Sequence, residues 1–214
     1  MFDHLWLLIQ RGGVVMWPLL FLSLLSMTLA FERAFFWLRI NHRRRLANVE
    51  QMARLLRGGQ TVAARALAQA DDSLYGHVVA TLLDESINDA LVVDLIESSR
   101  SRLERFMPTL STIITVAPML GILGTVFGII SSFQVLSDRL AVSDPRDVGH
   151  GIAEALLTTA VGLIVAIFVL FPYNGFRAQV DRTLGRIESL VAAASGPVLQ
   201  ADQAVKPPGD GSER

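Results

Sequence analysis

The sequence predicts an all-α integral membrane protein with three transmembrane helices and long cytoplasmic helical extensions. Two observations carry this prediction. Hydrophobic residues make up 51% of the chain and charged residues only 18%, whereas soluble domains typically carry about 25% charged residues. In addition, the chain contains three long runs without a charged side chain, and roughly 20 apolar residues are enough to cross a bilayer as a helix.

The first transmembrane helix is predicted over residues 14–37. Its uncharged part ends at Phe31, and Glu32 and Arg33 would then lie at the interface. The preceding residues, 1–13, are predicted to form a periplasmic N-terminal segment. A cleaved signal peptide is the alternative, but only Arg11 precedes the apolar run and no small-residue cleavage site follows it. An uncleaved span is therefore the prediction.

Residues 38–105 are predicted to form a cytoplasmic helical insert. The segments 62–70 and 77–87 have the composition of short helices, and Thr61 is a candidate N-cap for the first of them. The next apolar run is longer than a bilayer needs, because 32 helical residues extend over about 48 Å and the hydrocarbon core is about 30 Å thick. We therefore expect a helix from about Leu91 to continue into the second span.

The rest of the chain divides by the same criteria. The second transmembrane helix is predicted over 106–137, a periplasmic loop over 138–150 and the third transmembrane helix over 151–176. A cytoplasmic helix is predicted over 177–194. Residues 195–214 are rich in proline, glycine and charge and are predicted to be a disordered tail.

Arginine distribution predicts the orientation of the spans. Four arginines lie between Arg39 and Arg45, and further arginines precede the second span and follow the third. The N-terminal segment contains only Arg11, and the arginines of loop 138–150 are offset by aspartates. Because short cytoplasmic flanks carry the excess of arginine and lysine, the N-terminus is predicted to be periplasmic and the C-terminus cytoplasmic.

Composition also excludes several functions. Without cysteine, the chain can form no disulfide, zinc–thiolate site or thiol nucleophile. A net charge of −1 argues against a nucleic-acid partner. The glycine-rich run in the second span lacks the lysine of a phosphate-binding loop. No hydrolase motif or catalytic cluster occurs, so we expect neither an enzyme nor a metal or other cofactor.

The second span contains a stripe of small residues. Gly121, Gly124 and Gly128 recur at spacings of three and four, and Thr125 lies on the same side. Such glycines let another helix approach closely, and Pro118 adds a possible kink. Plain helix packing is one interpretation of this stripe. A polar pathway sealed by the small faces of neighbouring helices is the other.

The third span repeats this pattern and adds an acid. Glu154 and Thr158 are four residues apart and share a face, while Thr159 and Gly162 belong to an adjacent stripe of small residues. An ionisable residue at membrane depth normally faces a bundle interior or a watery cavity. Glu154 at the outer interface, and threonines that only bond the preceding turn, are the alternatives.

Two stretches resemble the MotA/TolQ/ExbB proton channel family. They are "APMLGILGTVFGIISSF" at 117–133 and "GIAEALLTTAVGLIVAI" at 151–167. Both look like the signature patterns of that family, in the same order and across a short outer loop. Three spans with a cytoplasmic insert fit the ExbB/TolQ branch better than MotA, which has four spans.

The resemblance implies a subunit of a proton channel, or stator, in the bacterial inner membrane. A homopentamer would enclose an ExbD/TolR-like single-span partner that carries a transmembrane aspartate, and would energise a TonB- or TolA-like protein that spans the periplasm and acts at the outer membrane. Membrane lipid would surround the ring. The alternative function is a non-conducting membrane scaffold that assembles partner subunits.

The resemblance also suggests roles for single residues. The proton pathway would use Thr125, Thr159 and Glu154, whereas Thr158 stands where some relatives have alanine, which puts its role in doubt. The residues expected to pack the helices into a ring are Pro118, Gly121, Gly124, Gly128 and Gly162.

Overall fold

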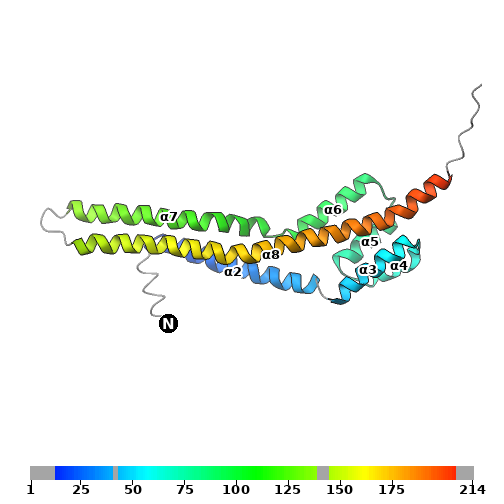
Figure 1. The fold of residues 1–214 in the computed structure, drawn as a ribbon, viewed down its shortest axis with the longest axis horizontal. Coiled ribbons are helices and arrows are strands. Elements are labelled where there is room, and N and C mark those ends of the chain that lie inside the picture. Colours follow the sequence, from blue (N-terminus) through cyan, green and yellow to red (C-terminus); the bar gives the residue numbers. More distant parts are fainter. Residues whose placement is uncertain (1–12, 41–42, 139–144, 206–214) are drawn as a thin grey trace, which may run out of the picture. The chain divides into compact units, whose positions relative to one another are not determined.

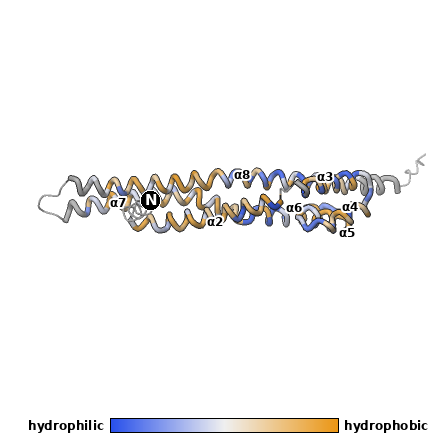
Figure 2. The backbone as a smooth tube through the Cα atoms, turned by 90° about the horizontal axis from the view of Figure 1, so that it is seen from below, coloured by the Kyte–Doolittle hydropathy of each residue, from blue (hydrophilic) through white to orange (hydrophobic). Residues whose placement is uncertain are grey.

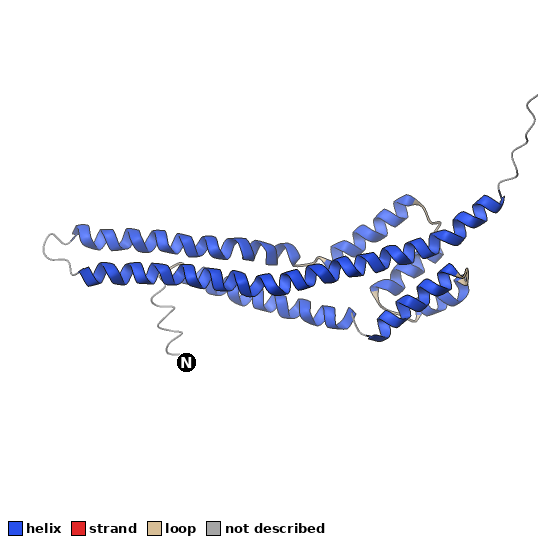
Figure 3. Ribbon diagram, viewed as in Figure 1, coloured by secondary structure: helices blue, strands red, loops and turns tan. Residues whose placement is uncertain are grey.

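The structure is a computed structural model that describes residues 13–40, 43–138 and 145–205. Over these residues it contains α-helices joined by short turns and no strand (Figures 1 and 3). The helices are α2 (Met16–Ile40), α3 (Arg43–Arg57), α4 (Thr61–Gln69), α5 (Leu74–Asp84), α6 (Asp89–Leu103), α7 (Met107–Asp138) and α8 (Pro145–Val205).

Three of these helices are long and apolar enough to cross a membrane. The qualifying stretches are Met16–Ile40, Met107–Gln134 and Gly151–Gly196. Figure 2 shows hydrophobic residues along α2, α7 and the first part of α8, and more hydrophilic residues further along α8. The prediction of an all-α membrane protein with three spanning helices is confirmed. Which side of the membrane each end faces stays a prediction.

The chain divides into two compact units. The membrane unit comprises Met1–Ala34 and Phe106–Arg177, and the second unit comprises Phe35–Arg105 and Ala178–Arg214. Helices α2 and α8 therefore contribute residues to both units. Each unit has its own buried residues.

The membrane unit buries one face of each helix and exposes large apolar side chains elsewhere. Leu19 and Leu110 are fully buried, whereas Phe31 and Phe168 are 65% and 75% exposed. Exposed phenylalanines at this density would be unfavourable in water. They suit a surface that faces lipid or another apolar helix.

The second span starts at a break in the helix, and the prediction that α6 continues into it is wrong. α6 ends at Leu103, and Phe106 adopts a φ of 68° before α7 begins. A left-handed conformation is unfavourable for a bulky side chain. Here the ring of Phe106 lies 5.3 Å below the guanidinium carbon of Arg33, whose side chain is almost completely buried. This cation–π contact therefore lies directly at the break.

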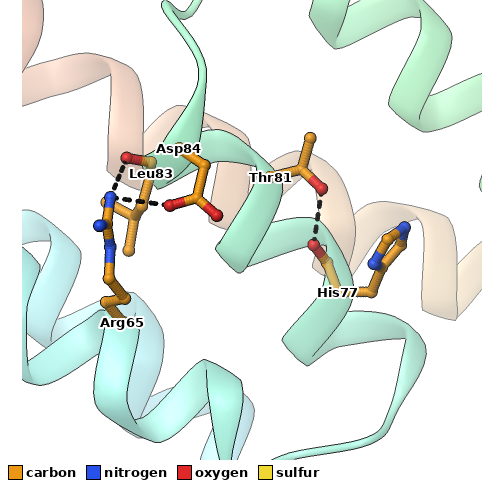
Figure 4. A network of polar contacts seen from close by, with 5 residues as sticks. All are labelled: Arg65, His77, Thr81, Leu83 and Asp84. Carbon is orange, nitrogen blue, oxygen red and sulfur yellow. Dashed lines mark hydrogen bonds and ion pairs between the residues drawn. The ribbon is translucent and has the colours of Figure 1, made fainter.

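The second unit is built from short helices with defined ends. Arg65 of α4 donates a hydrogen bond to the carbonyl oxygen of Leu83 and pairs with Asp84 at 2.9 Å, which ties α4 to the last turn of α5 (Figure 4). Within α5, the hydroxyl of Thr81 donates to the carbonyl of His77 at 3.0 Å. These contacts add polar connections to a core that includes Tyr75.

The predicted N-cap of the first short helix is also wrong. Thr61 is the first residue of α4, and Gln60 precedes it without a side-chain capping bond. Among the described residues, the side chain of Ser73 caps α5 and that of Asn88 caps α6. Both have the extended backbone that an N-cap requires, and this conformation depends on the preceding turn.

α8 extends beyond its predicted ends. It begins at Pro145, inside the predicted loop 138–150, and continues to Val205, inside the predicted disordered tail. Proline is tolerated in a first helical turn, and extending an existing helix costs little once it is nucleated. Residues 1–12, 139–144 and 206–214, which belong to the predicted N-terminal segment, loop and tail, lie outside the described residues.

Candidate functional site

Helices α7 and α8 approach each other at backbone distance in the membrane unit. A Cβ atom added to Gly162 would lie 2.5 Å from the carbonyl oxygen of Ala117, and one added to Gly121 would lie 2.9 Å from the Cα of Thr159. Ordinary contacts of a Cβ atom begin at about 3.4 Å. Any side chain at these two positions would therefore force backbone atoms apart.

The close approach continues toward the other end of the helix pair. A Cβ atom on Gly128 would lie 2.5 Å from the Cβ of Ala155. Added Cβ atoms on Gly124 and Gly151 would collide with the hydroxyls of Thr158 and Ser132. We call these five contacts, from Ala117–Gly162 to Ser132–Gly151, the small-residue ladder.

The ladder changes the interpretation of the predicted packing residues. Its α7 members run from Ala117 to Ser132, a rise of about 22 Å at 1.5 Å per residue. The glycines of both spans meet within one chain. That these faces also seal a ring of subunits stays a prediction. Ala117 and Gly151 belong to the ladder but were not predicted; antiparallel alignment of the two stripes is the signal that would have found them.

Two hydroxyls connect α8 to the backbone of α7. Thr159 donates a hydrogen bond to the carbonyl oxygen of Gly121 at 2.8 Å, and the hydroxyl of Thr158 lies 3.5 Å from the same oxygen. Thr158 makes its shorter bond, 2.7 Å, to the carbonyl of Ala155 in its own helix. The Gly121 carbonyl is thus a shared acceptor within the ladder.

Thr125 lies one helical turn from this acceptor. Its hydroxyl donates to the carbonyl oxygen of Ile122 at 2.6 Å, within α7. Because residues four apart lie on the same helix face, Thr125 continues the line formed by Gly121 and Thr159. These three residues come from the two spans that carry the sequence motifs, and we call them the threonine cluster.

The residues predicted to line the proton pathway differ in how deeply they are buried. Thr158 is 1% exposed and lies against Gly124 inside the ladder, as expected of a packing residue. Thr125 and Thr159 are half-buried, so each keeps part of its side chain at the surface of the helix pair. Glu154 is also half-buried and lies one turn before Thr158 on α8.

The threonine cluster offers hydrogen-bond acceptors to an approaching group. A hydroxyl has one proton and two acceptor lone pairs, and both protons of the cluster are already donated to backbone carbonyls. The free lone pairs can accept a hydrogen bond from water or from a neutral carboxylic acid. A carboxylate would need one of the protons to turn away from its carbonyl.

Pro118 introduces a local change in the backbone of α7. It lies inside the helix and is half-buried, and its missing N–H leaves the carbonyl of Ile114 without the usual intrahelical donor. The neighbouring Ala117 carbonyl lies against Gly162. The proline is therefore placed at the start of the ladder, where α8 has no side chain to resist a bend.

The described residues contain no group of three or more histidine, aspartate or glutamate side chains that could hold a metal ion. The groups that the site does contain are the hydroxyls of Thr125 and Thr159 and the backbone carbonyl of Gly121, with the carboxyl of Glu154 further along α8.

The chain is similar to known membrane transport proteins. Residues 58–189 match the family described as "MotA/TolQ/ExbB proton channel family". A Synechocystis protein named as a biopolymer transport protein, ExbB-like 3, is 35% identical over 84% of this chain and 88% of its own length. Biopolymer transport protein ExbB of Salmonella typhimurium is 35% identical over 62% of this chain and 64% of its length. Tol-Pal system protein TolQ of Pseudomonas aeruginosa is 38% identical over 42% of this chain and 39% of its length. With three spanning helices and a family match that covers most of the sequence, the chain belongs to the MotA/TolQ/ExbB proton channel family, in its ExbB/TolQ branch.

Proposed function

We propose that this chain is the ring-forming subunit of a proton-driven stator in the bacterial inner membrane, with its N-terminus in the periplasm and its C-terminus in the cytoplasm. It would use the proton motive force to energise a TonB- or TolA-like protein that acts at the outer membrane. The observation that carries the proposal is the threonine cluster: half-buried hydroxyls on the two motif-bearing spans of a proton channel family.

The proton carrier is supplied by a partner. The apolar stretch Met107–Gln134 has no acid or base, and the only acid in the apolar part of α8 up to Phe176 is Glu154, near the end of the span. A fixed charge in the middle of a span would be costly. An ExbD/TolR-like helix that brings an aspartate to the threonine cluster fits this arrangement, and Glu154 would shape the outer entrance.

The hydrogen-bond pattern favours the neutral form of that aspartate at the cluster. A protonated acid can donate to the oxygens of Thr125 and Thr159 while their protons stay on the backbone carbonyls. A charged aspartate would have to break these bonds to obtain donors. The cluster would therefore hold the acid in its proton-carrying state.

A homopentamer around two partner helices requires further helix contacts. The ladder is used within the chain, so the contacts between subunits would involve the exposed apolar faces. α7 offers Ile122 and Phe133, which are 58% and 63% exposed, and α8 offers Phe168 and Phe171, each 75% exposed. The large area of such faces on one chain supports an assembly in which part of it is covered by neighbours.

Proton flux into liposomes that contain this protein and its single-span partner tests the proposal. Thr125→Val removes a hydroxyl whose hydrogen bond lies within its own helix, so we expect flux to fall about tenfold, the effect of losing one hydrogen bond, with the oligomer intact. Thr28→Val is the matched control, because Thr28 makes the same kind of intrahelical bond, at 2.9 Å to Leu24 on α2.

Thr159 needs a different design, since its hydroxyl also joins two helices. Thr159→Ser keeps the hydroxyl and is expected to retain flux, while Thr159→Val is expected to lose it. Unchanged flux in the Thr125→Val, Thr159→Val double variant would reject the cluster as the pathway. An assembled complex without any flux would instead favour the non-conducting scaffold.

A further inference from the structure

A pocket lined by arginines lies in the second unit. It has a volume of about 400 Å³ and is formed by α3 and the later part of α8. Arg54 and Arg57 contribute from α3, and Arg186 contributes from α8. Neither the family signature stretches nor the proposed proton pathway involves these residues.

The positive charge of this pocket is poorly balanced. Glu50 is the only acid among the lining residues, against three guanidinium groups. Arg186 donates to the hydroxyl of Tyr75 at 3.4 Å, and Arg57 lies 3.5 Å from the hydroxyl of Ser189. Both partners are neutral. Within the described residues, the ion pairs of other arginines, such as Arg65–Asp84 and Arg100–Glu104, lie outside the pocket.

Convergence of like charges is unfavourable unless an anion joins them. The two neutral contacts orient guanidinium groups without neutralising them, so each keeps further N–H donors. Two or more planar guanidinium groups around one hollow suit an anion with several oxygens, because each can bind two of those oxygens at once. The floor of the hollow is apolar, with Val49, Ala53 and Leu190.

We propose that this pocket, named here the arginine pocket, binds a phosphate-bearing anion. A phosphate or diphosphate group would contact Arg57 and Arg186 directly, with Arg54 at the rim. The size of the hollow is at the small end of ligand sites, which run from about 300 to 1,000 Å³. The group can belong to a soluble phosphate compound or to the headgroup of an anionic lipid, and both present the same oxygens to the arginines.

Calorimetric titration of the full-length protein with inorganic pyrophosphate tests this site. The protein is in neutral detergent at low ionic strength and without divalent metals. Saturable binding is expected for the parent. The Arg57→Gln, Arg186→Gln double variant should bind at least about tenfold more weakly, because hydrogen bonds to a charged group are lost. Glutamine keeps a polar amide at both positions without the charge, and the thermal midpoint of the circular dichroism signal reports whether the fold is kept.

Two further variants make the result specific. Arg54→Gln with Arg57→Gln changes two exposed residues of α3, and it replaces the first variant if that one unfolds. Arg65→Gln with Arg100→Gln removes the same charge from arginines that pair with Asp84 and Glu104. This charge-matched control should bind pyrophosphate as the parent does. Equal weakening in the control would show diffuse electrostatic attraction and overturn the proposal, as would undiminished binding by the pocket variants or no saturable binding by the parent.

Lipid nanodiscs distinguish the two sources of phosphate. If a lipid headgroup occupies the arginine pocket, pyrophosphate binding should be present in phosphatidylcholine discs and lost in discs that contain phosphatidylglycerol. If the natural ligand is soluble, binding should persist in both. The readout is binding rather than proton flux, so failure of this proposal would leave the proposed stator function unaffected.

Discussion

Replacing Gly162 with alanine should weaken the packing of α7 against α8. The added methyl group would lie 2.5 Å from the carbonyl oxygen of Ala117 and 3.3 Å from the Cα of Gly121. Both are backbone atoms, so the helices must separate by roughly 1 Å to restore ordinary contact distances of about 3.4 Å. That separation would also stretch the hydrogen bond from Thr159 to Gly121, which is 2.8 Å long.

The size of the destabilisation can be isolated by comparison with a second glycine of the same helix, Gly175. Overpacking a well-packed contact costs about 1–3 kcal/mol. Alanine also has a higher helix propensity than glycine, by about 1 kcal/mol, which opposes that cost. Gly175→Ala has the same propensity gain, but its Cβ atom meets nothing within 4 Å. The difference in unfolding free energy between the two variants should therefore be about 1–3 kcal/mol, the overpacking cost alone.

The assay is unfolding of the purified protein in mixed micelles with increasing sodium dodecyl sulfate, followed by tryptophan fluorescence. Trp17 and Trp37, both in α2, are reporters in the described part of the chain. Gly175→Ala should unfold at the same or a higher detergent fraction than the parent, and Gly162→Ala at a lower fraction than Gly175→Ala. Equal midpoints for the two alanine variants would refute the reasoning, because they would show that the two helices are not in backbone contact at Gly162.

Three further predictions concern orientation and the second unit. A cysteine in place of Ser143 in this cysteine-free chain should react with an impermeant thiol reagent added to spheroplasts, and one in place of Ala47 should not; the reverse labelling pattern would overturn the predicted topology. Asp71→Ala should lower the free energy of unfolding by about 1–3 kcal/mol, because the buried backbone N–H of Ser73 loses the carboxylate acceptor at 2.9 Å. Asp72→Ala, at the exposed neighbouring position, should change it little. Similar melting temperatures for the two variants would contradict the assigned bond. Asn88→Ala should lower the free energy of unfolding by about 1 kcal/mol, because α6 loses its N-cap, whose side chain accepts a hydrogen bond from the N–H of Leu91 at 2.8 Å. Thr61→Ala should lower it less, because Thr61 does not cap α4. A larger decrease for Thr61→Ala would argue against these helix starts.

Much of the membrane architecture could be predicted from sequence alone. The three uncharged runs located the spanning helices, because the free energy of placing a side chain in lipid depends mainly on that side chain and its near neighbours. The two signature stretches indicated the family for a similar reason: their residues are contiguous in sequence. The spacing of glycines and threonines also identified which faces of the second and third spans carry the packing and hydroxyl residues.

What those faces contact was decided only by the tertiary structure. The glycine stripes fit equally well between subunits or within one chain, and the position of Gly162 against the Ala117 carbonyl selects the second. Thr125, Thr158 and Thr159 look alike in sequence, yet Thr158 is enclosed in the ladder while the other two remain half-buried. Phe106, whose left-handed backbone lies between the end of one helix and the start of the next, contacts Arg33 from a different span. Likewise, Arg57 and Arg186 are distant in sequence and line one pocket only because α3 packs on α8. Each of these outcomes depends on which residue, distant in the sequence, a side chain contacts. The composition of the local segment does not determine that contact.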